Sequence, residues 1–251
     1  QPIFSGVPCV LMSPAYFLGR PLRWLEAISQ YRGTISGGPD FAYRLCSERV
    51  SDSALERLDL SHWRVAYSGS EPIRLDTLER FAEKFAPCGF TPNNFFASYG
   101  LAEATLFVAG GTRGQGIPAL RLDEQALAAN RAEPGQGTAI MSCGTHQPEH
   151  AVLIVEPQTL AELDDNCVGE IWATGPSIAH GYWRNPEATA KTFVQHAGRT
   201  WLRTGDLGFM RNGEVFITGR LKDLLIVRGH NLYPQDIEKT IEREVEGVRK
   251  G

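Results

Sequence analysis

The residues best suited to chemistry on a nucleotide lie in the stretch SYGLAEAT, residues 98–105. Tyr99 offers a flat aromatic face on which a purine can stack, and Gly100 lets a phosphate approach the backbone closely. Glu103 supplies a hard carboxylate oxygen of the kind that Mg²⁺ prefers. Because the apolar run 94–97 precedes the stretch, we expect it at the end of a strand, where open α/β sheets bind ligands. An ordinary strand end with one exposed acid would give the same pattern, so the stretch alone leaves both interpretations open.

Three further segments contain residue types that fit a nucleotide. Asp206, in the glycine turn TGD, could accept hydrogen bonds from both hydroxyls of a ribose. Arg220, in GRLKD, could add charge-assisted hydrogen bonds to a ribose or a phosphate. The small residues of SGSEP, residues 68–72, would leave room for a flat base against the backbone. Taken alone, TGD is better explained by a turn-stabilising acid and GRLKD by a solvated charge cluster, whereas ordinary turn chemistry explains SGSEP equally well.

The elements that must position these residues alternate between short β-rich runs and amphipathic helices, which predicts a layered α/β fold. Residues 110–150 have little hydrophobic periodicity beyond a helical patch at 123–130, and we expect them to form an extended surface excursion. We expect a turn at 37–39. Strands are predicted at 7–12, 32–36, 63–67, 94–97, 151–155, 169–174, 201–202 and 214–218, and helices at 21–31, around 41–45, 51–58 and 75–85.

Composition excludes several classes of protein. With 251 residues, of which 42% are hydrophobic, the chain can bury a substantial core. A formal net charge of −4 and a pI near 5.9 argue against a nucleic-acid-binding surface. No apolar run approaches the length of a membrane span. Five cysteines without CxxC spacing favour a reduced, cytoplasmic setting over disulfides or zinc.

The order and spacing of five segments resemble the adenylate-forming superfamily of acyl and aryl ligases, which includes acyl-CoA synthetases, luciferases and adenylation domains of non-ribosomal peptide synthetases. These segments are SGSEP, SYGLAEAT, GYWRNPEAT, TGDLGF and GRLKDLLIVRGHNLYPQDIE, and they span nearly the whole chain. Within the superfamily, ISGGPDFAYRL, SYGLAEATLFVAGG and LIVRGHNLYPQDIE resemble fatty acyl-AMP ligases in particular. This resemblance implies the layered α/β N-terminal domain of the superfamily with a β-rich subdomain, followed by the beginning of a small α+β C-terminal domain.

The resemblance also implies a division of the chain into four parts. Residues 1–109 would be the α/β subdomain of the AMP-binding domain, and residues 110–150 the insertion typical of fatty acyl-AMP ligases. Residues 151–219 would form the β-rich subdomain, and residues 220–251 the hinge and the start of the C-terminal domain. In the family, the insertion restrains the C-terminal domain and is associated with rejection of coenzyme A.

The activity implied is ATP- and Mg²⁺-dependent activation of a fatty acid to an acyl-adenylate. The acyl group would then pass to the phosphopantetheine thiol of an acyl carrier protein in polyketide, non-ribosomal peptide or lipid biosynthesis. Glu103 would hold Mg²⁺ and, with Arg220, carry catalysis, and Lys222 would lie at the hinge about which the C-terminal domain rotates. The remaining roles implied are nucleotide binding by Ser70, Glu71, Pro72, Tyr99, Gly100, Ala102, Asp206, Ile217 and Arg220, and acyl binding by Gly38, Pro39 and Phe41.

The chain departs from the family pattern at several points. Many relatives place Thr where this chain has Ala102, although fatty acyl-AMP ligases commonly have Ala there, and several carry His where this chain has Ser36. The phosphate-binding loop of the family should precede Gln1 and its catalytic lysine should follow Gly251. We therefore expect a segment that folds partly, binds ATP weakly and does not turn over. Two alternatives stay open: a fatty acyl-CoA synthetase, which the 110–150 tract disfavours, and a non-catalytic nucleotide-binding fragment.

Overall fold

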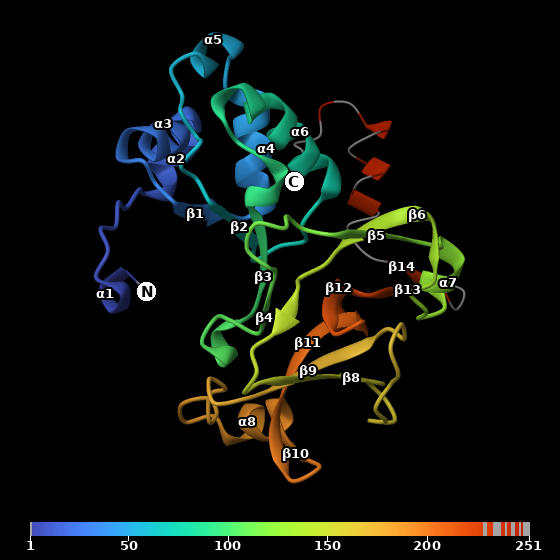
Figure 1. Cartoon of the computed structure of the whole chain (residues 1–251). Helices are drawn as coiled ribbons and strands as arrows, with labels where there is room; N and C mark the ends of the chain where they lie inside the picture. The colour runs from blue at the N-terminus through green and yellow to red at the C-terminus, as the bar shows by residue number, and fades with distance from the viewer. Residues whose placement is uncertain are drawn as a thin grey trace.

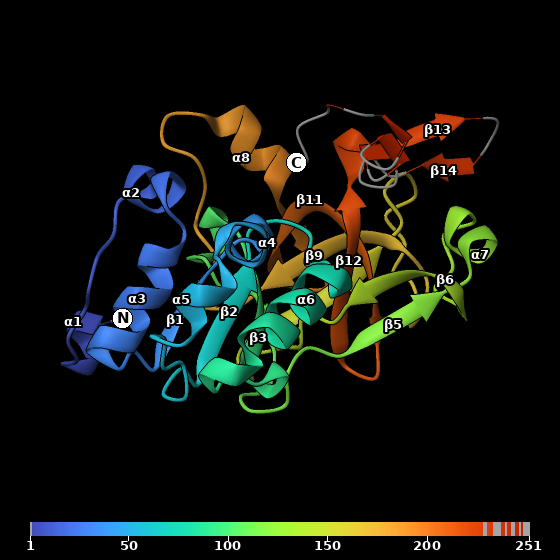
Figure 2. The same cartoon turned by 90° about the horizontal axis from the view of Figure 1, so that it is seen from above.

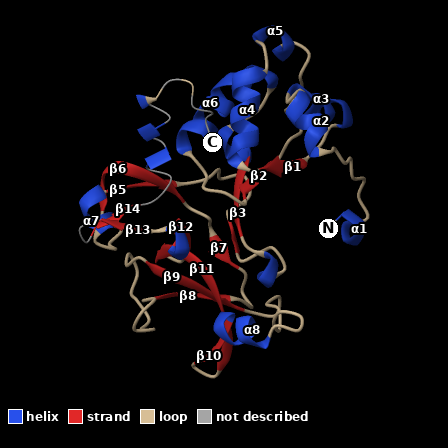
Figure 3. Cartoon of the chain, turned by 180° about the vertical axis from the view of Figure 1, so that it is seen from behind, coloured by secondary structure: helices blue, strands red, loops and turns tan. Residues whose placement is uncertain are grey.

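The computed structural model describes residues 2–227, 230–232, 237–238, 240–241, 244–245 and 247. Most helices gather at one end of the molecule and most antiparallel strands at the other (Figure 1; Figure 3 shows the same division from behind). Part of the segment LIVRGHNLYPQDIE, residues 225–238, and part of the expected start of the C-terminal domain at 220–251 lie outside the described residues. No helix in the described part is long and apolar enough to cross a membrane.

The first sheet joins five strands in the order β1-β2-β3-β4-β7. Its three parallel strands are β1 (Ile35–Gly38), β2 (Val65–Gly69) and β3 (Phe95–Tyr99), and its antiparallel strands are β4 (Ala109–Gly110) and β7 (Thr145–His146). Because parallel strands share one direction, the segments that follow β1, β2 and β3 leave the sheet at a common edge. Those segments are the ones that carry the predicted acyl, base and metal contacts.

The helical end is built on an aromatic core. Its helices are α1 (Pro2–Ser5), α2 (Pro14–Gly19), α3 (Leu22–Tyr31), α4 (Asp40–Arg49), α5 (Asp52–Leu55) and α6 (Leu75–Phe85). Phe81 and Phe85, one turn apart on α6, are fully buried with Trp63 and Tyr43. The rings of Tyr43 and Phe81 meet edge to face at 5.1 Å between centroids. Each such ring contributes about 2–3 kcal/mol by burial, and together they fix α4 and α6 against the sheet.

The second sheet is antiparallel and has the order β10-β11-β9-β8, with β12 paired to β11. Its strands are β8 (Ala151–Val155), β9 (Gly169–Thr174), β10 (Phe193–His196), β11 (Arg199–Arg211) and β12 (Glu214–Arg220). Helix α8 (Pro186–Thr192) lies beside β10 in Figure 1 and begins after Asn185, whose side chain accepts a hydrogen bond from the Ala188 amide. The short turn η4 (Leu221–Asp223) follows β12.

The 110–150 tract is more ordered than the sequence indicates. It contains the hairpin of β5 (Ala119–Leu122) and β6 (Pro134–Met141), with α7 (Glu124–Ala128) between them. The hairpin extends from the first sheet toward α7 in the view from above (Figure 2). The side chains of Leu122 and Ile140 pack with Phe209 and Phe216 of the second sheet, which explains why a tract with weak periodicity holds one conformation. A last hairpin, β13 (Leu225–Val227) and β14 (His230–Leu232), contacts α7.

Several predicted elements are wrong. The strand predicted at 7–12 has no regular structure, since Val7, Val10 and Leu11 are exposed and no strand pairs with them in the described part. The turn predicted at 37–39 is instead the end of β1: a Cβ on Gly37 would stand 2.1 Å from the Tyr67 carbonyl oxygen, so this glycine serves close strand approach. The helix predicted at 51–58 is reduced to α5, and α8 and β10 were not predicted. The four-part domain division stays a prediction.

Candidate active site

The common edge of the parallel strands joins two of the predicted binding segments. Gly38 ends β1, Pro39 precedes α4, and the Phe41 amide donates a hydrogen bond to the Glu71 carboxylate at 2.6 Å. Ser70 follows β2 with a φ of +70°, which turns the chain sharply away from the sheet. The stretch predicted to bind the acyl chain therefore lies directly beside the stretch predicted to bind the base.

A hydrogen-bonded chain of three side chains connects the two sheets. The Tyr99 hydroxyl, at the end of β3, donates to Asp206 Oδ2 at 2.8 Å. Asp206 Oδ1 lies 3.0 Å from Arg220 Nε, in an ion pair between neighbouring positions of β11 and β12. Ile217 packs against the cluster that contains Tyr99. The structure thus brings together four predicted nucleotide-binding residues that are up to 121 positions apart in the sequence.

Burial sets the protonation states of Asp206 and Tyr99. Asp206 is 6% exposed, and its burial raises the pKa of the carboxyl group, while the hydrogen bond from Tyr99 and the Arg220 guanidinium act to lower it. Burial also raises the pKa of Tyr99 well above its ordinary value. The phenol therefore stays a hydrogen-bond donor at neutral pH, and it keeps the carboxylate in a fixed orientation.

Asp206 reaches Tyr99 because β11 is irregular at this point. Pairing with β9 is interrupted between Arg203 and Leu207, and Gly205 has a φ of +69°. A bulge of this kind bends the strand and redirects its side chains. The TGD motif is thus a β-bulge in a long strand, and its glycine is required by the backbone conformation.

A buried carboxylate holds the bulge in place. Glu170 of β9 is 2% exposed, and its Oε1 accepts a hydrogen bond from the Gly205 amide at 3.2 Å. Its Oε2 accepts from Trp172 Nε1 at 3.0 Å and from two nitrogens of Arg203, at 3.0 and 2.8 Å. Sequence reasoning missed Glu170, although an acid within the apolar strand EIWAT was an available signal, because buried carboxylates require partners.

Glu103 lies on the short turn η3 (Ala102–Ala104) after β3. Its Oε1 accepts a hydrogen bond from the Tyr182 hydroxyl at 2.6 Å, and its carbonyl accepts one from the Ala179 amide at 2.8 Å. That hydrogen bond to the carboxylate is the main cause of the raised pKa of Tyr182. Tyr182 was not predicted as a site residue, although it belongs to the GYW segment that carries the resemblance. At the start of the turn, a Cβ on Gly100 would stand 1.8 Å from the Leu106 carbonyl oxygen, so the turn closes only around glycine.

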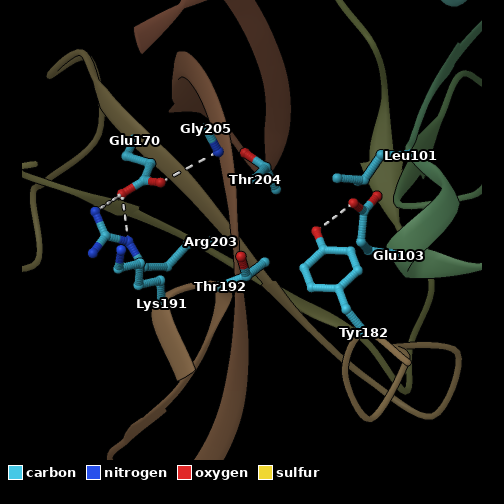
Figure 4. A pocket seen from close by; sticks show the side chains of 9 residues that line it. All are labelled: Leu101, Glu103, Glu170, Tyr182, Lys191, Thr192, Arg203, Thr204 and Gly205. Atoms are coloured by element: carbon cyan, nitrogen blue, oxygen red, sulfur yellow. Dashed lines mark hydrogen bonds and ion pairs between the residues drawn. The ribbon is translucent and has the colours of Figure 1, made fainter. Parts of the chain in front are cut away.

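A cavity of about 450 Å³ opens between these elements. In Figure 4, Leu101, Glu103 and Tyr182 stand on one side and Glu170 with Arg203 on the other. Its lining is completed by Lys191, Thr192, Thr204 and Gly205. Polar groups of both signs therefore face one space, as expected for a site that takes a charged ligand.

The donor set fits Mg²⁺ that arrives with a nucleotide. The described residues contain no cluster of three or more side chains able to ligate a metal, and Glu103 alone presents a carboxylate from the turn after β3. Mg²⁺ commonly binds through one or two carboxylates together with substrate phosphates and water. Glu103 satisfies that requirement without a preformed protein cage.

Other predicted residues lie apart from this contact chain. Lys222 is exposed on η4, outside the cavity lining, and Ala102 is exposed on η3. Pro72 is exposed in the segment after β2. The Ser36 hydroxyl accepts a hydrogen bond from Trp24 Nε1 at 2.9 Å. Ser36 therefore binds α3 to β1 in this structure.

Comparison with known proteins identifies the family. The family model for AMP-binding enzymes matches residues 1–183. The chain belongs to this family of AMP-binding enzymes. It is 46% identical to the medium-chain-fatty-acid–[acyl-carrier-protein] ligase JamA of Moorena producens, over 99% of the chain and 44% of that protein. It is 43% identical to the ligase of the same description, TtuA, of Teredinibacter turnerae, over 97% of the chain and 40% of that protein.

The fold of this AMP-binding family member also matches solved structures. The fatty acyl-adenylate ligase of Legionella pneumophila, solved in complex with acyl adenylate and pyrophosphate, is 40% identical with a TM-score of 0.85. The match covers 97% of the chain and 44% of that protein. The similarity confirms the resemblance to fatty acyl-AMP ligases and the predicted α/β fold class. The chain spans less than half the length of these relatives.

Proposed function

We propose that this chain is the nucleotide-binding part of a fatty acyl-AMP ligase, which activates a fatty acid with ATP and passes it to an acyl carrier protein. The observation that carries the proposal is the hydrogen-bonded series of Tyr99, Asp206 and Arg220, because it aligns an aromatic ring, a carboxylate and a guanidinium where the two sheets meet. The named activities of the similar proteins support the choice of a fatty acid and a carrier protein.

In the proposed first reaction, a fatty carboxylate oxygen attacks the α-phosphorus of ATP and pyrophosphate leaves. Tyr99 stacks on adenine beside the backbone of Ser70 and Glu71, Asp206 accepts hydrogen bonds from the ribose hydroxyls, and Arg220 contacts the ribose or a phosphate. Glu103 would hold Mg²⁺, which would offset the phosphate charge. These residues act by orientation and electrostatics, since none of them forms a bond to the substrate.

In the proposed second reaction, the thiolate of a phosphopantetheine arm attacks the acyl carbonyl, a thioester forms and AMP leaves. The position of Gly38, Pro39 and Phe41 at the same edge supports their assignment to the mouth of the acyl channel. The hydrogen bond between Phe41 and Glu71 would then link the orientation of the acyl group to that of the nucleotide. Lys222, just after Arg220, is proposed as the hinge of the C-terminal domain.

We further assign the 110–150 tract to the restraint of that domain. Helix α7 contacts β14, and Asn231 Nδ2 donates a hydrogen bond to Asn130 Oδ1 at 2.6 Å. A tract that holds the segment after the hinge limits its rotation, which is the physical basis for favouring the carrier protein over coenzyme A as acceptor. This contact favours the fatty acyl-AMP ligase over the acyl-CoA synthetase.

The test uses the protein expressed from the complete reading frame that contains this chain. It is incubated with ATP, Mg²⁺ and a mixture of fatty acids, while coenzyme A competes with a phosphopantetheinylated carrier protein. Mass spectrometry is expected to show acyl-AMP and acyl-carrier protein without acyl-CoA. Efficient formation of acyl-CoA would move the protein to the acyl-CoA synthetases, and absence of any adenylate would contradict the proposed activity.

The 251-residue chain alone serves as the second arm of this test. We expect it to bind ATP weakly and to form no acyl-AMP, because the relatives it matches are more than twice as long. Acyl-AMP formed by the chain alone would show that its own residues suffice for the first reaction, and would contradict the expectation that residues beyond both ends are needed.

A further inference from the structure

We propose that Tyr182 is a positioning residue that fixes the Glu103 carboxylate for the metal carried by the nucleotide. This inference rests on the proposed function, in which Glu103 binds Mg²⁺. The Tyr182 hydroxyl donates to Oε1 of Glu103 at 2.6 Å, and within the described part of the chain no hydrogen bond is made to Oε2. One oxygen is thereby held by the protein while the other remains available to a cation (Figure 4).

Tyr182 is itself held by α8 rather than by the turn that it supports. The Tyr182 amide donates a hydrogen bond to the Thr189 hydroxyl at 2.9 Å. The Thr189 hydroxyl in turn donates to the Asn185 carbonyl at 2.8 Å. The Tyr182 ring meets Phe193 at 5.7 Å between centroids. Gly181 has a φ of +149°, and a Cβ there would stand 2.5 Å from Thr189 Cγ2, so the chain can enter this position only with glycine.

The segment around Tyr182 also fixes the backbone of the turn that bears Glu103. The Ala179 amide donates to the Glu103 carbonyl at 2.8 Å, and Thr105 Oγ1 donates to the Ser177 carbonyl at 2.7 Å. These two hydrogen bonds place the main chain, and the hydrogen bond from Tyr182 places the side chain. Removal of the phenol alone should therefore free the Glu103 carboxylate while the turn keeps its position.

Groups that hydrogen-bond to a metal ligand typically change metal affinity by about 10–100-fold when they are removed. Tyr182 is partly exposed, so we expect the lower end of that range, about tenfold. Removal of the Tyr182 hydroxyl should raise the Mg²⁺ concentration that ATP binding and catalysis require. Binding of nucleotide without metal depends on Tyr99 and Asp206 and should not change.

The experiment compares wild type, Y182F and Y31F in the complete protein. Tyr31 is an exposed tyrosine at the end of α3 and provides a matched control for loss of one phenol oxygen. ATP binding is measured by calorimetry without Mg²⁺ and at a series of Mg²⁺ concentrations, and the Mg²⁺ concentration that gives half-maximal pyrophosphate release is measured separately. We expect Y182F to need about tenfold more Mg²⁺ in both assays, with metal-free ATP binding and unfolding temperature close to those of wild type and Y31F.

Each other outcome overturns the inference. An unchanged Mg²⁺ dependence in Y182F would show that the hydrogen bond does not orient a metal ligand. An equal loss of ATP binding with and without Mg²⁺ would show that Tyr182 only supports the local structure. The variant E103A distinguishes these failures from a failure of the proposed function. If wild type forms acyl-AMP and E103A loses its dependence on Mg²⁺, the proposed function stands whatever Y182F shows. In a protein that already carries E103A, the further change Y182F should have no effect on the Mg²⁺ dependence.

Discussion

Replacement of Glu170 by Gln tests whether a buried carboxylate sets the geometry of the nucleotide site. The change keeps the size of the side chain and removes its charge. Glu170 receives four hydrogen bonds, two from Arg203 and one each from Trp172 and Gly205. A glutamine offers one acceptor oxygen. If its amide nitrogen faces the Gly205 amide, one of the four hydrogen bonds is lost, and if it faces Arg203 and Trp172, three are lost, so the first orientation is favoured and the Gly205 amide loses its acceptor.

The stability lost in E170Q follows from the burial of the Glu170–Arg203 ion pair. The side chain of Glu170 is 3% exposed and that of Arg203 is 27% exposed, so the pair is shielded from water on the carboxylate side. Breaking a fully buried pair typically costs about 3–5 kcal/mol, and the partial exposure of Arg203 lowers the expected cost to about 2–4 kcal/mol. At roughly 2 °C per kcal/mol for a chain of this size or longer, the unfolding temperature should fall by about 5 °C.

ATP binding should also weaken, because Glu170 holds the bulge that positions Asp206. Without an acceptor for the Gly205 amide, the bulge loses the contact that fixes Asp206 opposite Tyr99. Loss of about one hydrogen bond to a charged group, of the order of 1.5 kcal/mol, should weaken ATP binding by roughly tenfold. Thermal unfolding and calorimetric ATP binding in the complete protein measure the two effects.

The control is E162Q in the same protein. Glu162 pairs with His196 at 2.6 Å, but its side chain is 52% exposed, and exposed pairs contribute at most about 1 kcal/mol. We expect E162Q to unfold and to bind ATP like wild type. If E170Q also behaved like wild type, the buried carboxylate would not be the anchor of the bulge, and the account of how Asp206 is positioned would be wrong.

Two further predictions concern the helical end and the turn after β3. Burial raises the pKa of Asp40 from 3.8 to about 6, so the folded protein binds this proton more tightly than the unfolded chain and loses roughly 3 kcal/mol of stability as pH rises between these values. The variant D40N should abolish this loss of stability in urea unfolding measured as a function of pH. An unchanged pH profile would contradict the raised pKa of Asp40. The variant G100A should lose about 3 kcal/mol or more of its free energy of unfolding, because the new Cβ would lie 1.8 Å from the Leu106 carbonyl oxygen. The control G19A, whose Cβ would lie 3.6 Å from Arg23 Nη1, should fold normally. Equal unfolding temperatures of the two variants would contradict the tight turn at Gly100.

The part of the site that the sequence could predict is the part set by local chain direction. Tyr99 ends a strand and Glu103 follows it in sequence, and the edge of a parallel sheet is where such residues must lie. The proximity of Asp206 to Tyr99 depends on a bulge and on packing between two sheets, neither of which leaves a periodic pattern. Gly37 was predicted in a turn because glycine is common there, while the structure uses it for close approach of β2.

Ion pairing distinguishes three carboxylates of the proposed site: Glu103 and Glu170, which line the cavity, and Asp206, which lies beside Tyr99. Glu170 is paired with Arg203, and Asp206 with Arg220, so each of these negative charges is already offset by a guanidinium. Glu103 receives only the hydrogen bond of a neutral phenol among the contacts described, so its charge is oriented without being cancelled. In the proposed function, a divalent ion that enters with phosphates would therefore bind Glu103 in preference to the two paired acids, and Asp206 would accept hydrogen bonds from a ribose. The different partners of the three acids therefore support the proposed division of roles, in which Glu170 anchors the bulge, Asp206 accepts the ribose hydroxyls and Glu103 binds the metal.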